Sequence, residues 1–368
     1  NPGKHGIYDF LEQDTESYQI RPTTYSKMSR PAIWDLFNEK KKDVGVINYP
    51  LVHPPDKVDP FFISGIPASD EDSIAYPDFI QDTLESTDYR VHPHASSDNP
   101  KEYFEELIDL TESQVDLTIK LAEEYDPELL WTVFMSTDWA QHYLWDKKID
   151  NTNAVEKLYQ KFDSYIGEIV GELADGCNVV VVSDHGARKI DGEIHLNSLL
   201  EKWGYIQRKE TSKENNLSRI KKILLASMWK IGSNLPPSLK NLVKQKTPSN
   251  TLNDIRAAAD IAQLNMHNSI DWANTTAFSY GYMGRVFLHT DNYPEGKISK
   301  ESDFEKLRDE LILKLEDLEH PKTNEKIIEN VYQSESIYWG DNAALAPDLV
   351  IEPKGWRYMI YGDFGDGT

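Results

Sequence analysis

Residues 101–182 carry the pattern that most constrains the fold, because helical and strand-like segments alternate there. Apolar side chains recur every three or four positions in residues 101–124 and again in residues 155–169, which is typical of helices with one buried face. Each stretch leads into an uninterrupted apolar run, at residues 129–135 and at residues 179–182, as in strands buried on both faces. This order predicts an α/β fold with a mainly parallel central sheet sandwiched by helices.

Shorter patterns extend this prediction along the rest of the chain. Helical spacing recurs in residues 34–41 and 304–318, and short apolar runs in residues 44–48 and 349–351 predict two further strands.

An Asp–His pair follows each of the two predicted strands of the 101–182 region. Asp138 and His142 come after the first strand and are four positions apart, so a helix that begins here would place both on one face. Asp184 and His185 come directly after the second strand. Because ligand sites in open α/β sheets lie outside the carboxyl ends of the strands, we expect the four side chains to converge.

The donor atoms of these four residues suit a metal centre. Carboxylate oxygens and imidazole nitrogens together bind zinc, manganese or iron. Two ions can stabilise both the attacking and the leaving oxygen of an in-line phosphoryl displacement. An Asp–His sequence after a strand is also typical of a turn with a helix cap, and the spacing alone leaves both interpretations open.

The composition argues against several other classes of protein. Lys and Arg total 39 and Asp and Glu total 62, and the net charge of −23 argues against nucleic-acid binding. The single cysteine, Cys177, excludes an internal disulfide framework, and we predict that it is buried and inert. No apolar run reaches the roughly 18 residues of a membrane span, and no signal peptide is visible. These observations favour a soluble, cytoplasmic protein, but the sequence does not identify the compartment.

One stretch departs from this acidic composition. Residues 215–253 contain no Asp or Glu but seven basic residues. We interpret residues 208–267 as a small cap inserted between two parts of the α/β core, residues 1–207 and 268–368. The basic residues belong either to a solvated helix whose apolar face packs on the core, or to a positive lip at residues 219–246 that meets an anionic substrate or a membrane surface.

Several motifs resemble those of the type I phosphodiesterase/nucleotide pyrophosphatase family, which belongs to the alkaline phosphatase superfamily. The most specific are Ser136-Thr137-Asp138 with Gln141-His142, and Ser183-Asp184-His185-Gly186. Weaker matches lie in residues 1–7, 34–36, 44–50, 195–200 and 346–349, so the resemblance covers nearly the whole chain.

The resemblance implies a bimetallic hydrolase of phosphodiester or pyrophosphate bonds, with two divalent ions, zinc or manganese, and a small phosphoester substrate such as a nucleotide. One ion would be held by Asp138 and His142 with a C-terminal histidine of the family. The other would be held by Asp184 and His185 with an N-terminal aspartate and a nucleophilic Thr or Ser. These three further groups have no counterpart here, so we expect an inactive fragment, truncated at both ends, whose nucleophile lies upstream of Asn1.

Other functions and other residues complete the set of expectations. Phosphomonoesterase, sulfatase-like or phosphomutase chemistry stays open on the same scaffold, as does a non-catalytic binding module that keeps part of the metal site. Tyr280, Tyr282 and Arg285 are candidate substrate-binding residues, with simple packing as the alternative. We expect His195 to make a polar contact at a helix N-terminus, and His5 to make a structural contact beside the site.

Overall fold

The computed structural model describes residues 1–69, 72–173, 176–209, 266–299 and 303–365. The chain divides into two compact units, each described here by itself. One unit is Thr24–Lys189, and the other combines Asn1–Thr23 with Ile190–Thr368. The predicted cap at residues 208–267 lies almost entirely outside the described residues, so the proposed division into core and cap stays a prediction.

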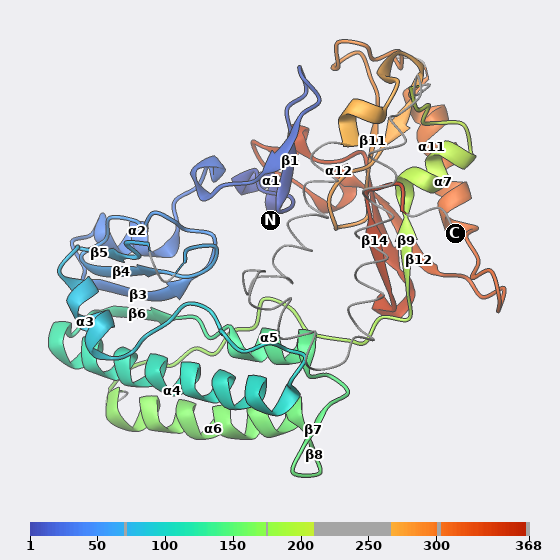
Figure 1. Ribbon diagram of the computed structural model, residues 1–368. Coiled ribbons are helices and arrows are strands. Elements are labelled where there is room, and N and C mark those ends of the chain that lie inside the picture. Colours follow the sequence, from blue (N-terminus) through green and yellow to red (C-terminus); the bar gives the residue numbers. More distant parts are fainter. Residues whose placement is uncertain (70–71, 174–175, 210–265, 300–302, 366–368) are drawn as a thin grey trace, which may run out of the picture. The chain divides into compact units, whose positions relative to one another are not determined.

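A four-stranded sheet forms the centre of the Thr24–Lys189 unit (Figure 1). Its strands follow the order β5 (Ala75–Tyr76), β4 (Pro60–Ser64), β3 (Val44–Tyr49) and β6 (Leu129–Thr132). β3 pairs in parallel with both β4 and β6, and β5 is antiparallel to β4. The three parallel strands therefore bring their carboxyl ends to one edge of the sheet, where ligand sites form in such folds.

Helices pack on both faces of this sheet because its side chains alternate between the faces. Trp34 of α2 (Ile33–Asn38) packs with Val44 and Phe62 on one face. Leu117 and Leu121 of α4 (Pro100–Tyr125) belong to the cluster that contains Ile47. The remaining elements of the unit are α3 (Ile80–Ser86), α5 (Ser136–Tyr143), α6 (Ala154–Leu173), the hairpin of β7 (Lys148–Ile149) and β8 (Thr152–Asn153), and a 3-10 turn at Tyr25–Lys27.

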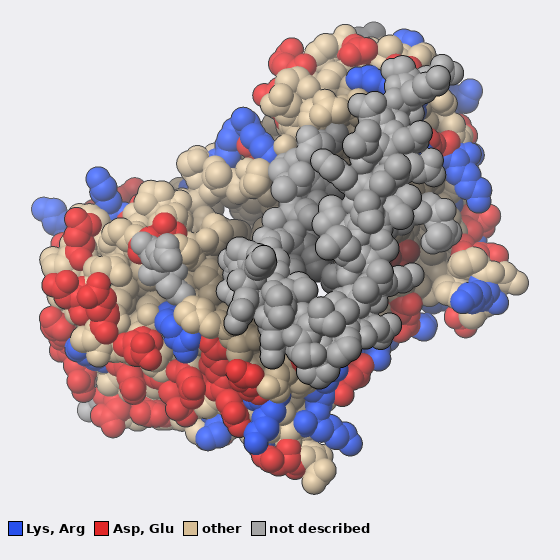
Figure 2. Space-filling model, viewed as in Figure 1, with Lys and Arg blue, Asp and Glu red and all other residues tan. Residues whose placement is uncertain are grey.

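The long helix α4 has clear start and stop signals and one polar face. Pro100 lies in its first turn, where the missing N–H costs nothing. Asp126, in the left-handed region, donates its N–H to the Ala122 carbonyl at 2.8 Å and ends the helix. The exposed face is acidic, with Glu102, Glu105, Asp109, Glu112, Asp116, Glu123 and Glu124, and acidic side chains gather over this part of the surface in Figure 2.

The other unit contains an antiparallel sheet of four strands. Their order is β10 (Ala277–Phe278), β11 (Arg285–Leu288), β13 (Leu349–Pro353) and β12 (Ile328–Gln333). A parallel pair is formed by β14 (Tyr358–Tyr361) and β9 (Gly192–His195), and a hairpin by β1 (Leu11–Gln13) and β2 (Ile20–Pro22). Its helices are α1 (Pro2–His5), α7 (Leu196–Lys202), α11 (Phe304–Glu316) and α12 (Ser334–Ile337), with 3-10 turns at His267–Ser269, Trp272–Asn274, Ala343–Leu345 and Lys354–Trp356.

Most predicted elements are confirmed. The helices expected at residues 101–124, 155–169 and 304–318 correspond to α4, α6 and α11, and the strands expected at 44–48 and 349–351 to β3 and β13. The strand expected at residues 129–135 is shorter, since β6 ends at Thr132, and its side chains are half-buried. Among the described residues no helix combines the length and the apolar character needed to cross a membrane.

The prediction of a buried strand at residues 179–182 is wrong. The four valines do not form a β-strand, and their exposure ranges from 53% for Val179 to 78% for Val180. An apolar run forms a buried strand only where a neighbouring strand supplies partners for its backbone, and the residues that follow this run hydrogen-bond locally. Ser183 Oγ donates to the His185 carbonyl at 2.6 Å, and the Asp184 carboxylate accepts from the His185 N–H at 3.1 Å. Cys177 belongs to the same stretch and is exposed, not buried as predicted.

A buried histidine lies in the core of the Asn1–Thr23 and Ile190–Thr368 unit. The His289 side chain has Nδ1 2.9 Å from the Thr275 carbonyl and Nε2 2.9 Å from the Tyr18 hydroxyl. The Thr275 carbonyl can only accept, so Nδ1 carries the proton and Nε2 accepts from Tyr18. The Tyr18 oxygen accepts in turn from the Glu295 N–H at 3.1 Å. Burial lowers the pKa of His289 below 6.5, and the ring is neutral in the folded state.

We expect this histidine to make the folded state sensitive to acid. Because the pKa of His289 is lower in the folded than in the unfolded chain, the unfolded chain binds more protons as the pH falls below about 6.5. The free energy of unfolding should therefore fall below that pH, by up to about 1.4 kcal/mol for each unit of pKa difference. Urea unfolding between pH 8 and pH 5.5 measures this, with His289→Gln as the control that removes the titrating group. Equal pH slopes for both proteins would contradict the prediction.

Candidate metal centre

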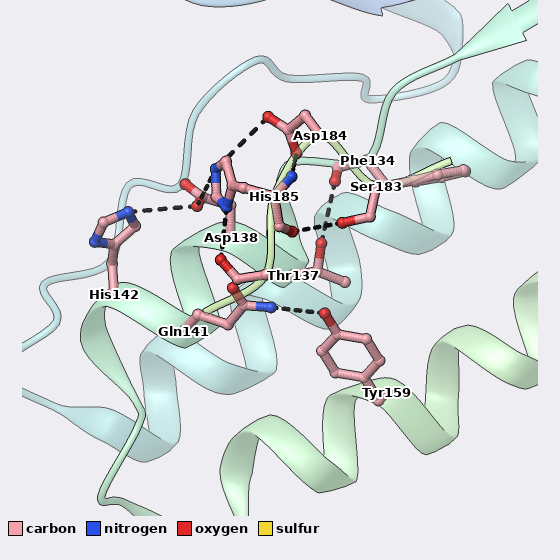
Figure 3. A network of polar contacts seen from close by, with 10 residues as sticks. Phe134, Thr137, Asp138, Gln141, His142, Tyr159, Ser183, Asp184 and His185 are labelled. Atoms are coloured by element: carbon pink, nitrogen blue, oxygen red, sulfur yellow. Dashed lines mark hydrogen bonds and ion pairs between the residues drawn. The ribbon is translucent and has the colours of Figure 1, made fainter. Parts of the chain in front are cut away.

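Helix α5 carries the first Asp–His pair on one of its faces. The helix begins at Ser136, four residues after β6 ends, and places Asp138 and His142 one turn apart. The His142 Nε2 atom lies 3.3 Å from Asp138 Oδ1. Figure 3 shows both side chains on the same side of the helix. The predicted helical spacing is therefore observed.

The second pair reaches the same place from a loop. His185 Nε2 lies 4.0 Å from Asp138 Oδ1 and 3.6 Å from Asp184 Oδ2. All four predicted side chains thus converge around the Asp138 carboxylate (Figure 3). Beyond this loop, the Lys189 ammonium pairs with Asp146 at 2.7 Å, which ties its end to the chain that follows α5.

The orientation of the His185 ring has a chemical consequence. Its Nδ1 lies 2.9 Å from the Gly186 carbonyl, which can only accept, so Nδ1 carries the proton. In the neutral ring Nε2 then has its lone pair free, and this atom points to the Asp138 and Asp184 carboxylates. Nε2 faces two carboxylate oxygens across distances longer than a hydrogen bond, and it can carry a proton that pairs with them or bind a cation between them. A divalent cation in this position would be attracted by both carboxylates.

The chemistry of these donors fits a transition metal, although the ligand set is incomplete. Two carboxylates and two imidazoles are ligands of zinc and manganese, and a backbone carbonyl on the second ring nitrogen is the usual outer partner of a metal-bound histidine. The four side chains are partly or largely exposed, from 29% for Asp138 to 89% for Asp184. In the part of the chain that the structure describes, no three or more His, Cys, Asp or Glu residues are arranged to hold an ion.

The three candidate substrate-binding residues lie in the other unit, around a buried ion pair. Arg285 Nη2 is 2.8 Å from Asp9 Oδ2, and the two side chains are only 4% and 0% exposed. The Asp9 carboxylate also accepts the backbone N–H of Leu11 at 3.2 Å and of Tyr282 at 3.0 Å. The guanidinium lies 4.7 Å from the Tyr280 ring centre. In this structure Arg285 therefore holds β11 to the segment before β1.

His195 makes a polar contact at the N-terminus of α7, as expected. It is the N-cap residue of α7, but its side chain makes no hydrogen bond to the helix backbone. Instead Nδ1 hydrogen-bonds Asp363, Nε2 lies 3.7 Å from Glu193, and the ring stacks on Tyr361. The partner is 168 positions away, so no sequence pattern could have indicated it. His5 Nδ1 accepts the Ile7 N–H at 3.2 Å, and burial lowers its pKa.

Sequence reasoning also missed a buried polar group at the carboxyl end of the parallel strands. Asn48 and Gln114 are almost fully buried and hydrogen-bond each other at 3.3 Å. A signal was present, because Asn48 interrupts the otherwise apolar residues 44–48. The basic residues 219–246, by contrast, lie outside the described residues.

Comparisons with known proteins agree with this fold. The chain matches the family model described as type I phosphodiesterase / nucleotide pyrophosphatase over residues 1–367. Two solved structures of phosphonoacetate hydrolase from Sinorhizobium meliloti 1021 are similar, one with phosphonoformate at a TM-score of 0.53 and one with phosphonoacetate at 0.51. In each case the identity is 13%, and the match covers 98% of this chain and 68% of that chain. The comparison with curated proteins found no match. The predicted alkaline phosphatase-like α/β fold is confirmed.

Proposed function

The chain belongs to the type I phosphodiesterase/nucleotide pyrophosphatase family, and from this premise we propose that it is a metal-dependent hydrolase of phosphodiester or pyrophosphate bonds. Asp138 and His142 would hold one divalent ion, and Asp184 and His185 a second. Zinc or manganese suits these donors. The substrate would be a small phosphoester, such as a nucleotide.

A single observation carries this proposal. His185 Nε2 faces two carboxylates, at 3.6 and 4.0 Å, while its Nδ1 faces the Gly186 carbonyl. Carboxylate oxygens and an imidazole nitrogen gathered in this way are the donor set of a divalent ion. Two short motifs that are 42 residues apart build it, which is more than a turn or a helix cap requires.

The roles of the chain's own residues follow from their positions. Bound divalent ions would supply electrostatic stabilisation of the phosphoryl oxygens. The Asp138 carboxylate faces both imidazoles and would orient both pairs. The Gly186 carbonyl keeps the proton of His185 on Nδ1, so Nε2 stays free to bind. None of the described residues is assigned as the nucleophile.

Calorimetric titration of the purified 368-residue chain with ZnCl2 and MnCl2 tests the metal site directly. We expect saturable binding of zinc. Any hydrolysis should be faster for bis(4-nitrophenyl) phosphate than for 4-nitrophenyl phosphate or 4-nitrophenyl sulfate. Absence of zinc binding, or a preference for the monoester or the sulfate, would contradict the proposal.

Tyr280, Tyr282 and Arg285 stay proposed substrate-binding residues, with one constraint. The Arg285 guanidinium is engaged by Asp9 and by the Tyr280 carbonyl at 3.3 Å. Contact between Arg285 and a phosphoryl group would therefore compete with a buried ion pair, and the backbone N–H of Tyr282 donates to the same Asp9 carboxylate.

The basic segment at residues 219–246 gives a further prediction about substrate capture. Replacing Lys221, Lys222 and Lys230 with Gln should raise KM at low salt and leave Tm nearly unchanged, because a positive patch offsets the repulsion of an anionic substrate by a chain of net charge −23. A salt titration of kcat/KM in the active protein measures this. Identical salt slopes for the triple variant and the parent would leave the segment without a role in steering, and anionic vesicles then test the proposed membrane contact.

A further inference from the structure

We propose that Asn48 and Gln114 are positioning residues for the candidate metal centre, because they hold the turn from which α5 presents Asp138 and His142. The expected effect on metal binding rests on the proposed function, whereas the hydrogen bonds that hold the turn do not depend on it. It concerns a buried polar cluster at the carboxyl end of β3, which consists of Asn48, Gln114, Thr132 and the Val133 carbonyl.

Both backbone polar groups of Val133 are hydrogen-bonded. Its N–H donates to the Ile47 carbonyl at 3.1 Å, which extends the β3–β6 ladder by one residue. Its carbonyl accepts from Asn48 Nδ2 and from Gln114 Nε2, each at 2.8 Å. Both lone pairs of this carbonyl are thus used. The next two residues lead into Ser136, where α5 begins.

Asn48 reaches this carbonyl because the backbone of β3 is irregular there. The register of β3 against β4 advances from Val46–Phe62 to Tyr49–Ser64, so β3 has one extra residue in the interval. Asn48 has a φ of 59°, in the left-handed region that Asn tolerates better than most residues. Such bulges redirect a side chain and occur next to functional sites. Here the bulge coincides with the one buried amide of the strand.

Gly65 shows that this position is closely enclosed. A Cβ atom added at Gly65 would lie 2.7 Å from the Asn48 carbonyl oxygen and 2.8 Å from its Oδ1. Asn48 Oδ1 itself is buried without a hydrogen-bond partner, as is Ser64 Oγ. Buried polar groups that are only partly satisfied cost stability. The two amides nevertheless supply the donors of the Val133 carbonyl, which apolar side chains could not do, so the cluster fixes the geometry of the turn.

A second contact fixes the start of α5 to the same helix that carries Gln114. The Ser136 and Thr111 hydroxyls hydrogen-bond at 2.8 Å, and both residues are buried. Thr111 also donates to the Leu107 carbonyl within α4 at 2.7 Å. The turn of residues 133–135 is therefore anchored to α4 on both sides, through Gln114 before it and through Thr111 after it. The direction of α5, and with it that of Asp138, follows from these anchors.

The test compares zinc affinity with stability in the whole 368-residue chain. Asn48→Gly removes the amide without backbone strain, because Gly accepts a positive φ, and Gln114→Leu removes the second donor at similar volume. Each variant should weaken the zinc Kd by roughly 10- to 100-fold, the loss typical of removing an outer partner of a metal site. Ile80→Val and Leu84→Ala are the matched controls: they remove buried apolar volume from α3 and should lower Tm while leaving the zinc Kd unchanged.

A second readout decides the inference without any metal. In the metal-free chain, hydrogen exchange of the α5 amides should accelerate in Asn48→Gly and Gln114→Leu more than in a control variant of equal Tm. Variants that lower Tm but keep the parent's zinc Kd and α5 exchange would overturn the inference and make the cluster purely structural. If the parent chain binds no zinc, the proposed function fails, and the exchange comparison still decides whether the cluster positions α5.

Discussion

Asp138→Asn should abolish specific zinc binding and raise the zinc Kd by more than roughly 100-fold. This loss exceeds the one expected when a residue that only supports a metal ligand is replaced. The reason is geometric, since Asp138 Oδ1 is the one atom that both His142 and His185 face, at 3.3 and 4.0 Å. Asparagine keeps the shape of the side chain but removes the charge that attracts a cation. Asp184→Asn should have a smaller effect, because the Asp184 side chain is 89% exposed and faces His185 alone. Calorimetric titration with ZnCl2 gives both affinities.

The control for this variant is Asp150→Asn. Asp150 is exposed and pairs with Lys157, so the substitution removes the same charge from the same unit without touching the candidate centre. Its zinc Kd should equal that of the parent chain. If Asp138→Asn and Asp150→Asn weakened zinc binding equally, the ion would be attracted by the general acidity of the surface, and the four residues would not form a specific site.

Arg285→Met should lower the free energy of unfolding by about 3–5 kcal/mol, because it leaves the Asp9 carboxylate buried without its counter-ion. The pair joins Asp9, which precedes β1, to β11, and it is shielded from solvent on both sides. Asp9 would keep its two backbone N–H donors, from Leu11 and Tyr282, which are too few to compensate for the lost charge. Chemical denaturation at neutral pH measures the loss.

The double variant Asp9→Leu/Arg285→Met separates packing from binding at this site. With both charges removed, the loss of stability should be smaller than in Arg285→Met alone, because no unpaired charge stays buried. If Arg285 contacts the substrate, as its candidate role implies, the active protein should also show a raised KM in the double variant. An Arg285→Met variant as stable as the parent chain would show that the ion pair contributes nothing to folding.

The local parts of the candidate centre followed from sequence periodicity. The four-residue spacing of Asp138 and His142 predicted their common helical face, and α5 places them so. The convergence of the second pair was predicted for a reason that the structure does not support. Asp184 and His185 were expected at the end of a buried strand, but they reach Asp138 from a loop held by hydrogen bonds within residues 183–186.

The contacts that connect distant segments belong to the tertiary structure alone. Arg285 resembled a substrate-binding residue in the sequence, and only the fold shows Asp9 beside it, 276 positions earlier in the chain. The Asn48–Gln114 contact likewise depends on a bulge in β3 and on the position of α4 beside it.

The sequence by itself predicted the long helices α4, α6 and α11, the strands β3 and β13, and the helical face that Asp138 and His142 share. Periodicity and motif spacing are properties of neighbouring residues, and the backbone geometry of helices and strands transmits them directly. The tertiary structure decided which charges are buried and which polar groups hold α5. It also decided that the valines at residues 179–182 have no partner strand. These outcomes depend on which distant surfaces exclude water from one another, and burial of that kind has no signature in the local sequence.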